Sequence, residues 1–262
     1  MTQPLLQTIV LTGAAVALGA LPAAAQDFSW RGRVAQGQTV EIRGVNGEVH
    51  ALAARGNEVE VTAVKRARRS DPDEVNIEVI EHAGGVTICA VYPTPPRARR
   101  ENRCAPGDEW HSNTNDNDVN VDFTVRVPAG VTFDGRTVNG DVEVDSVPGD
   151  AHVSTVNGSV EVTAAGLVEA RTVNGGITAR MGRADWTGEL DFHTVNGSIT
   201  VYLPEGVNTE IEAQTVNGDI ESDWPVMVQG RFGPRRVRGT IGNGGRSLDL
   251  QTVNGSIRLL KR

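Results

Sequence analysis

Thr137-Val138-Asn139-Gly140 is the first of six copies of one tetrapeptide in the second half of this 262-residue chain. The other copies occupy residues 155–158, 172–175, 194–197, 215–218 and 252–255. Successive asparagines are 18, 17, 22, 21 and 37 residues apart. A period of about 20 residues is typical of stacked supersecondary units, each too small to bury a core alone. The repeat therefore predicts architecture more directly than it predicts chemistry.

Each Asn-Gly pair stands where the chain is expected to turn, because both residue types tolerate positive φ angles that β-branched neighbours do not. The motif valine and the later Val142 and Val144 are expected to face inward, and the threonine and the other polar residues to face solvent. The predicted repeat corners are Asn139, Gly140, Asn157, Gly158, Asn174, Gly175, Asn196, Gly197, Asn217, Gly218, Asn254 and Gly255.

This pattern is compatible with two all-β architectures. Asn-Gly between alternating runs is a hairpin signal, which would give an antiparallel meander or sandwich. A β-solenoid would instead use the motif as the same corner in every coil, about 4.8 Å from its neighbours, with valine on valine and asparagine amides in a ladder. Repetition of the whole tetrapeptide favours a single elongated β-solenoid. Segment 223–245 interrupts the pattern and predicts a protruding loop plus one degraded coil.

The first half of the chain has the same character with less regularity. Alternating runs predict strands at 39–43, 48–52, 58–64, 75–80, 86–91 and 119–127, with almost no helix. Gly44-Val-Asn-Gly47 is an early copy of the motif. We therefore expect one domain over 26–262, less regular over 26–131 and regular over 132–262. Its last strand is expected at 256–260, bare at one end of the stack.

The first 25 residues predict export. They carry no charged side chain, contain the apolar run 9–21 and end in Ala23-Ala24-Ala25, as a signal peptidase requires. A secretory signal at 1–25, cleaved after Ala25, is expected. An uncleaved anchor is the alternative, although the run is shorter than the roughly 20 residues of a bilayer span. The mature chain is expected to have no transmembrane segment and to reach the periplasm or the cell surface.

Cys89 and Cys104 are the only cysteines. In an exported protein, two cysteines that flank one loop most simply form a disulfide, which would stabilise a loop of this size by about 3 kcal/mol. A zinc site would need further ligands, and His82 and His111 lack finger-like spacing.

Composition narrows the partners. The formal net charge of −8 argues against nucleic acid. Basic clusters at 65–69, 97–103 and 231–238 are solvated surface or contacts with anionic lipid or acidic glycans. Thirty glycines, with only five Phe, four Trp and two Tyr, suit thin β units joined by tight turns.

No residue set predicts catalysis, a cofactor or a metal. Asp141, Glu143 and Asp145 belong to the repeated polar positions, whereas catalysis needs one singular group of residues with divergent pKa values. Segment 113–118 is rich in oxygen ligands but lacks the glycine and distal glutamate of a calcium loop, so a solvated turn is expected there.

The Thr-Val-Asn-Gly-(Asp/Ser)-(Val/Ile) repeats, the early copy at 44–47, the cysteine pair and the C-terminal segment 250–258 resemble the bacterial putative-adhesin family of β-strand-repeat domains, a domain of unknown function. The resemblance covers nearly all of the mature chain. It implies an exported or envelope-associated β-solenoid and brings no catalytic residues with it.

These observations favour a non-enzymatic exported protein of the cell envelope or surface, an adhesin-like binding or scaffold module. Its partner is unknown, with an envelope glycan or a surface protein as candidates. One alternative is a periplasmic structural or envelope-stress factor without an external ligand. A polysaccharide-active β-helix enzyme is the other.

Overall fold

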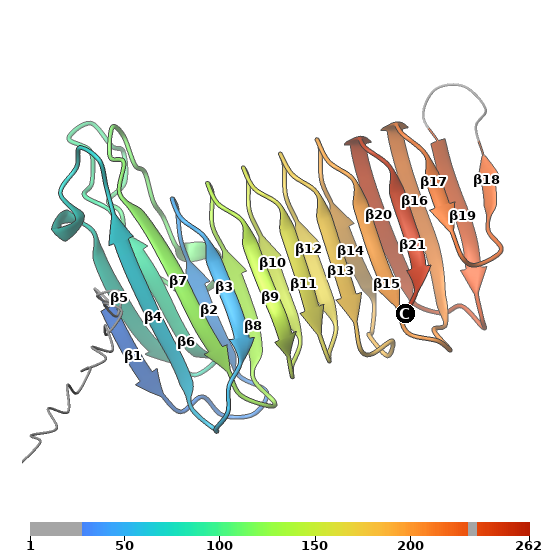
Figure 1. The fold of residues 1–262 in the computed structure, drawn as a ribbon, viewed down its shortest axis with the longest axis horizontal. Helices are drawn as coiled ribbons and strands as arrows, with labels where there is room; N and C mark the ends of the chain where they lie inside the picture. Colours follow the sequence, from blue (N-terminus) through green and yellow to red (C-terminus); the bar gives the residue numbers. More distant parts are fainter. Residues whose placement is uncertain (1–27, 230–234) are drawn as a thin grey trace, which may run out of the picture.

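The computed structural model describes residues 28–229 and 235–262, so the predicted signal at 1–25 and residues 230–234 lie outside the described residues. The described chain is all β apart from two short 3-10 helices, as expected (Figure 1). It contains no apolar helix of the length that a bilayer crossing requires.

The strands form two large mixed sheets. In spatial order, the ten-stranded sheet is β1 (Phe28–Gly32), β4 (Val59–Arg66), β7 (Asn120–Val127), β3 (Val49–Ala53), β9 (Val142–Val147), β11 (Val160–Ala164), β13 (Ile177–Met181), β15 (Ile199–Leu203), β21 (Ile257–Lys261) and β17 (Ile220–Ser222). The eleven-stranded sheet, in the same manner, is β18 (Met227–Gln229), β19 (Arg235–Ile241), β16 (Thr209–Asn217), β20 (Ser247–Asn254), β14 (Glu189–His193), β12 (Val168–Arg171), β10 (Ala151–Ser154), β8 (Thr132–Arg136), β2 (Thr39–Arg43), β6 (Gly85–Val91) and β5 (Asn76–His82). The 3-10 helices are η1 (Pro72–Glu74) and η2 (Gly107–Glu109).

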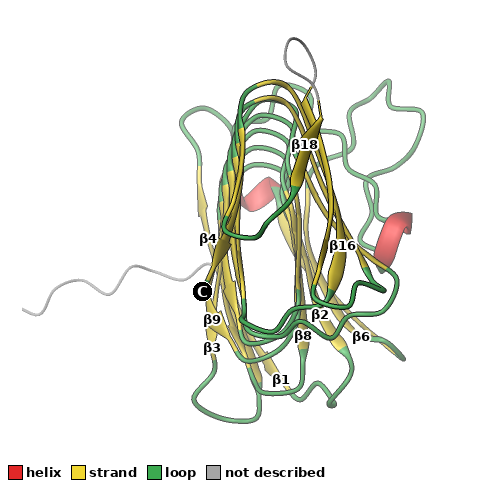
Figure 2. Ribbon diagram, turned by 90° about the vertical axis from the view of Figure 1, so that its right-hand side faces the viewer, coloured by secondary structure: helices red, strands yellow, loops and turns green. Residues whose placement is uncertain are grey.

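The two sheets face each other across a single hydrophobic core (Figure 2). Each repeat places one strand in each sheet, as β10 and β11 do, and the next repeat pairs with it in parallel. In the ten-stranded sheet this register stacks like residues directly: Val142, Val160, Ile177, Ile199 and Ile257 follow one another, each at most 1% exposed. Each such side chain contributes about 1.5–3 kcal/mol by burial.

The spatial order of the repeats differs from their order in the chain. Strands β20 and β21 lie between β14/β15 and β16/β17, with parallel partners on both sides. The expectation of a bare last strand at 256–260 is therefore wrong. The described part of segment 223–245 is not a degraded coil either, because β19 pairs antiparallel with β16 and β18 pairs antiparallel with β19 in the eleven-stranded sheet. The 37-residue spacing between Asn217 and Asn254 is needed to form β18 and β19 at the end of the sheet and then to bring the chain back to β20.

The N-terminal half shows the same insertion. Strands β2 and β3 carry the early motif and lie between β6/β7 and β8/β9, again with parallel pairing. Antiparallel strands β5, β4 and β1 close this end. The strands predicted in this half are present within a few residues, whereas β1 has no counterpart in the prediction. The expected disulfide joins Cys89 of β6 to Cys104 of the following loop, with Cα atoms 5.5 Å apart.

All the glycines of the repeat corners are needed for close approach, whereas only Gly47, Gly140 and Gly255 have positive φ. A Cβ atom on Gly158, Gly175 or Gly197 would overlap the carbonyl oxygen of the corner glycine of the neighbouring repeat, yet none of the three has φ in the left-handed region. Among the described non-glycine residues, only Asp116 and Ser146 have positive φ, so the motif asparagines do not. Among the predicted corners, the expected positive φ is present at Gly140 and Gly255 and absent from the asparagines and from the other corner glycines. All the corner glycines are needed because neighbouring corners lie too close for any side chain.

We expect Gly175→Ala to lower the free energy of unfolding by about 1–3 kcal/mol or more, because the added methyl meets backbone that cannot move without separating two repeats. Gly56→Ala is the matched control, since its Cβ would meet nothing within 4 Å and its φ lies outside the left-handed region. It should be neutral or stabilise by up to about 1 kcal/mol. Urea denaturation measures both, and equal values would contradict the close-approach explanation.

Candidate functional site

The motif copies line up along one edge of the stack, which we call the motif edge. It is the row of corners at 44–47, 137–140, 155–158, 172–175, 194–197, 252–255 and 215–218, where the chain passes from the eleven-stranded to the ten-stranded sheet. This is the upper edge of the stack in Figure 1. All twelve residues predicted as repeat corners lie on it.

The asparagines of the motif edge form a continuous amide ladder. Each Nδ2 group donates to the Oδ1 atom of the asparagine in the neighbouring repeat, at 2.7–2.8 Å. In spatial order the ladder is Asn46, Asn139, Asn157, Asn174, Asn196, Asn254 and Asn217. Asn46 is half-buried and the other six are exposed. Such stacked amide ladders stabilise repeated β structure.

The motif threonines and four of the six motif valines occupy the opposite sides to those predicted, whereas Val138 and Val195 are partly buried. The motif threonines are at most 4% exposed, whereas Val156, Val173, Val216 and Val253 are 38–39% exposed. The threonine hydroxyl explains the reversal, because it donates to the carbonyl oxygen of the corner glycine in the neighbouring repeat, as Thr172 does to Gly158 at 2.9 Å. All six copies make this bond. A valine there would leave a buried carbonyl without a partner.

The motif edge is consequently an uncharged strip on an acidic protein. It presents a row of asparagine amides beside a row of valines, both repeating at the strand spacing of about 4.8 Å. Each amide uses one N–H and one lone pair within the ladder and keeps another of each for a ligand. The strip can therefore form hydrogen bonds and apolar contacts at regular intervals.

The outer face of the eleven-stranded sheet is charged, but its charges are largely paired. His152 Nδ1 lies 3.0 Å from Glu169 Oε2, and Arg171 makes two hydrogen bonds of 2.7–2.8 Å with Asp191. The hydrogen bond to Glu169 raises the pKa of His152, and the same bond lowers the pKa of Glu169. A shallow pocket of about 250 Å³ lies among these residues and Asp134. Mutual neutralisation leaves the part of this face around His152 and Arg171 poorly suited to a charged ligand.

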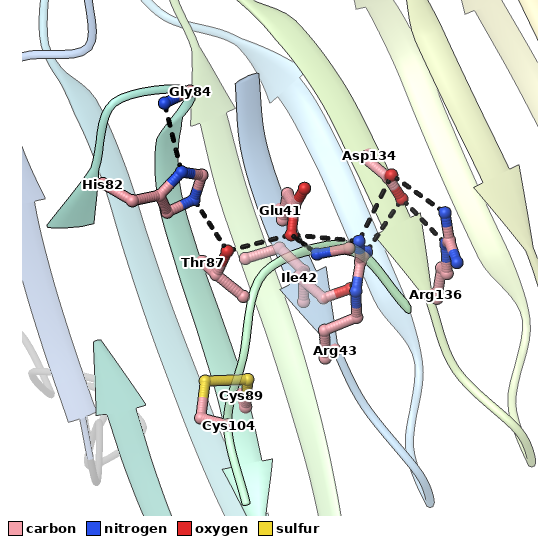
Figure 3. A network of polar contacts seen from close by, with 11 residues as sticks. Glu41, Ile42, Arg43, His82, Gly84, Thr87, Cys89, Cys104, Asp134 and Arg136 are labelled. Atoms are coloured by element: carbon pink, nitrogen blue, oxygen red, sulfur yellow. Dashed lines mark hydrogen bonds and ion pairs between the residues drawn. A yellow bond between two sulfur atoms is a disulfide. The ribbon is translucent and has the colours of Figure 1, made fainter. Parts of the chain in front are cut away.

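Arg43 forms a buried ionic network that sequence reasoning missed (Figure 3). Its fully buried guanidinium lies 2.8 Å from Asp134 Oδ1 and 3.0 Å from Glu41 Oε2. Glu41 also accepts from the Thr87 hydroxyl at 2.9 Å and from the Gly107 amide at 3.1 Å. The network thus fastens the loop that carries Cys104 onto the sheet. Nothing in the strand pattern signals it, because the partners of Arg43 and Glu41 come from other strands and from a loop distant in the sequence.

The oxygen-rich segment 113–118 uses its side chains locally. Asp118 accepts from the Ser70 amide at 2.8 Å, and hydrogen bonds from the Ser70 backbone and side chain lower the pKa of Asp118 to about 2. The Asn117 side chain accepts from the Val119 amide at 3.0 Å. The backbone N–H of Asn113 donates to Asn102 Oδ1, and its carbonyl oxygen accepts from Asn102 Nδ2. These oxygens support backbone turns rather than converging on one point, which fits the expected solvated turn.

The basic clusters are also partly neutralised where the structure describes them. Arg66 pairs with Asp122 at 2.6 Å, and Arg69 lies 3.6 Å from Asp118. In the third cluster, Arg236 and Arg238 both pair with Glu212, while residues 231–234 lie outside the described residues. The Arg97–Arg103 cluster lies in the loop between β6 and β7.

The comparisons with known proteins point to one family. The profile of the Toastrack DUF4097 family matches residues 107–260, more than half of the chain. This chain belongs to the Toastrack DUF4097 family. The match includes all six Thr-Val-Asn-Gly copies of this Toastrack protein and excludes the early copy at 44–47. It confirms the resemblance to an adhesin-like domain of unknown function.

Solved structures similar to this Toastrack chain include the two described next, whereas no curated protein sequence matches it. One is described as a putative cell adhesion protein from Clostridium sporogenes ATCC 15579, with 11% identity, coverage of 90% of this chain and 99% of that chain, and a TM-score of 0.45. The other is described as a putative adhesin from Bacteroides fragilis NCTC 9343, with 10% identity, coverage of 92% and 100%, and a TM-score of 0.29.

We expect Thr172→Val to lower the free energy of unfolding by about 1–2 kcal/mol, because the Gly158 carbonyl loses its hydroxyl donor inside the stack. The neighbouring change Val173→Thr places a hydroxyl on an exposed position and should stay within about 0.5 kcal/mol of the wild-type protein. Urea denaturation of the two variants decides the point. If Val173→Thr lowered the free energy of unfolding more than Thr172→Val, the result would support the original prediction that the motif valine faces inward.

The His152–Glu169 pair predicts a pH-dependent part of stability. Because the pKa of folded His152 lies above its ordinary 6.5, the pair stabilises fully below about pH 6.5 and less as pH rises through the folded pKa. The effect should remain below about 1 kcal/mol, since both groups are partly exposed. Thermal unfolding from pH 6 to pH 9 should therefore show a decline that His152→Gln lacks. Parallel curves for the two proteins would contradict it.

Proposed function

We propose that this Toastrack chain is a non-enzymatic, exported protein of the cell envelope or surface that acts as an adhesin-like binding or scaffold module. In this proposal residues 1–25 direct export and residues 26–262 form one elongated β-solenoid. The observation that carries the proposal is the motif edge, a straight, uncharged strip of repeated amides and valines.

Parallel pairing supports the solenoid. From β8/β9 to β14/β15, each repeat adds one strand to each sheet and pairs in parallel with the repeat before it. The antiparallel pairs are confined to the two ends of the stack. A meander or sandwich built from motif hairpins would instead have antiparallel pairs across each motif.

The disulfide supports export. The Cys89–Cys104 bond closes a loop that packs on the eleven-stranded sheet, and both cysteines are buried. Structural disulfides persist in oxidising compartments such as the periplasm and the cell exterior. The small-residue sequence before Gln26 points to the same compartments.

The chemistry of the motif edge favours an envelope glycan as the ligand. Free amide donors and acceptors match sugar hydroxyl groups, and the adjacent valines can pack against the C–H faces of sugar rings. The absence of charge along this strip suits a neutral polymer better than an anionic one. Its regular spacing allows several weak contacts with a repetitive ligand to act together.

The first measurement is location. Fractionation and proteolysis of intact cells should place the mature protein, beginning at Gln26, in the envelope or on the surface. A wholly periplasmic protein that binds no envelope material would favour the structural-factor alternative. An unprocessed cytoplasmic protein would overturn the proposal of export.

The second measurement is binding. Purified mature protein should bind envelope fractions or neutral glycans on an array, and Val173→Lys with Val253→Lys should weaken binding at least tenfold by placing two charges on the strip. Ala53→Lys with Ala165→Lys is the control, since it adds the same charge at exposed positions off the motif edge. Binding that is equal in both double variants, or absent from the wild-type protein, would contradict the proposal.

A further inference from the structure

One group of side chains departs from the repeating pattern. His50 of β3 lies beside Glu143 of β9 in the parallel register, and Asp145 follows Glu143 on the same outward face of the ten-stranded sheet. Immediately after Asp145, Ser146 has φ of 51° and the register between β9 and β11 shifts. This bulge turns two consecutive residues, Asp145 and Ser146, outward where a regular strand would turn only one.

The three side chains converge on one point. One ligand atom from each of His50, Glu143 and Asp145 lies within 4.8 Å of the other two. The His50 Nε2 and Asp145 Oδ2 atoms are 3.3 Å apart. Two ligands bound to Zn²⁺ at about 2.0–2.2 Å in tetrahedral geometry are about 3.4 Å apart. The His50–Asp145 pair therefore has this spacing, and Glu143 needs only a side-chain rotation to join it.

The charge at this point is also unbalanced. Among the described residues, the Glu143 carboxylate has no ion-pair or hydrogen-bond partner. The next acid along the same row, Glu161, is already paired with Arg180 at 3.0 Å. Glu143 and Asp145 bring two carboxylates to this point, and a divalent cation would balance their negative charge.

The remaining repeats lack this combination in the same two rows. The positions that follow Glu143 and Glu161 are threonines, Thr178 and Thr200. On the other sheet, His152 has a carboxylate partner in Glu169, but Arg171 flanks that pair. The group at His50 is therefore singular in the described chain, unlike the regular carboxylates that argued against a site.

We propose that His50, Glu143 and Asp145 form a binding site for a first-row divalent transition metal, represented by Zn²⁺. An imidazole with two carboxylates suits zinc and its neighbours, whereas Ca²⁺ and Mg²⁺ prefer oxygen ligands alone. Three protein ligands leave at least one position for water or for an atom of an external ligand. The site is independent of the proposed glycan binding, because it lies on a sheet face and not on the motif edge.

The test is a Zn²⁺ titration of chelator-treated, untagged protein by isothermal calorimetry. We expect one site per chain, with affinity reduced at least about tenfold in His50→Gln and in Asp145→Asn, the minimum that loss of a direct ligand should cause. Glu143→Gln should also weaken binding, and it changes an exposed side chain without a described partner, so its folding is secure. Zn²⁺ should raise the melting temperature of the wild-type protein more than that of these variants.

His152→Gln is the matched control, because it removes the other histidine–carboxylate pair and should leave Zn²⁺ binding unchanged. The proposal is overturned if the wild-type protein takes up no Zn²⁺ at millimolar concentration. It is overturned equally if the three site variants bind like the wild-type protein, or if His152→Gln alone abolishes binding. Each of these results is independent of glycan binding or cell location.

Discussion

The contact between neighbouring motif corners is the interaction on which the rest of this structure depends. Glycine lets one corner lie against the backbone of the next, the buried threonine hydroxyl completes the hydrogen bonding of the glycine carbonyl, and the asparagine amide adds a bond on the outer side. All three contacts join motif residues of neighbouring repeats. They therefore hold both sheets in one register and place Val142, Val160 and Ile177 in a single column of the core.

The two ends of the stack differ from the repeats in how their strands pair. A parallel stack exposes unpaired strand edges, which invite pairing with other chains. Here antiparallel strands finish three of the four sheet edges: β1/β4 and β5 at one end, and β18/β19 at the other. The fourth edge is the short strand β17, which pairs in parallel with β21. Near each end the path of the chain turns back toward the middle of the stack. The pair β2/β3 therefore lies between β6/β7 and β8/β9, and the pair β20/β21 lies between β14/β15 and β16/β17. Arg43 and His50, the residues with the most specific surroundings, both belong to such an inserted repeat.

Sequence reasoning succeeded within strands and failed across corners. Alternation placed Val142 and Val144 inside correctly, because both belong to β9. Val138 is partly buried against the core, as predicted, but extending the same parity to Val156 and Val173 was wrong. A corner separates the motif valine from the following strand, and alternation does not continue reliably through a turn. The motif edge could therefore be predicted only in part. The exposed asparagine ladder follows from the repeat, whereas the exposure of the valines does not. Arg43 and the group at His50 gave no sequence signal, because neither depends on the local pattern.

The sequence by itself determined the all-β class, the strand positions, the repeated corner and the cysteine pair, since these depend on local alternation and on residues that recur at a short period. Only the tertiary structure decided which repeat lies beside which. Every motif copy makes the same backbone and threonine hydrogen bonds, so any two copies can stack. The path of the connecting segments therefore determines which copies become neighbours. That choice brings His50 against Glu143 and Asp145, buries Arg43 under a distant loop and places the last motif copy inside the stack.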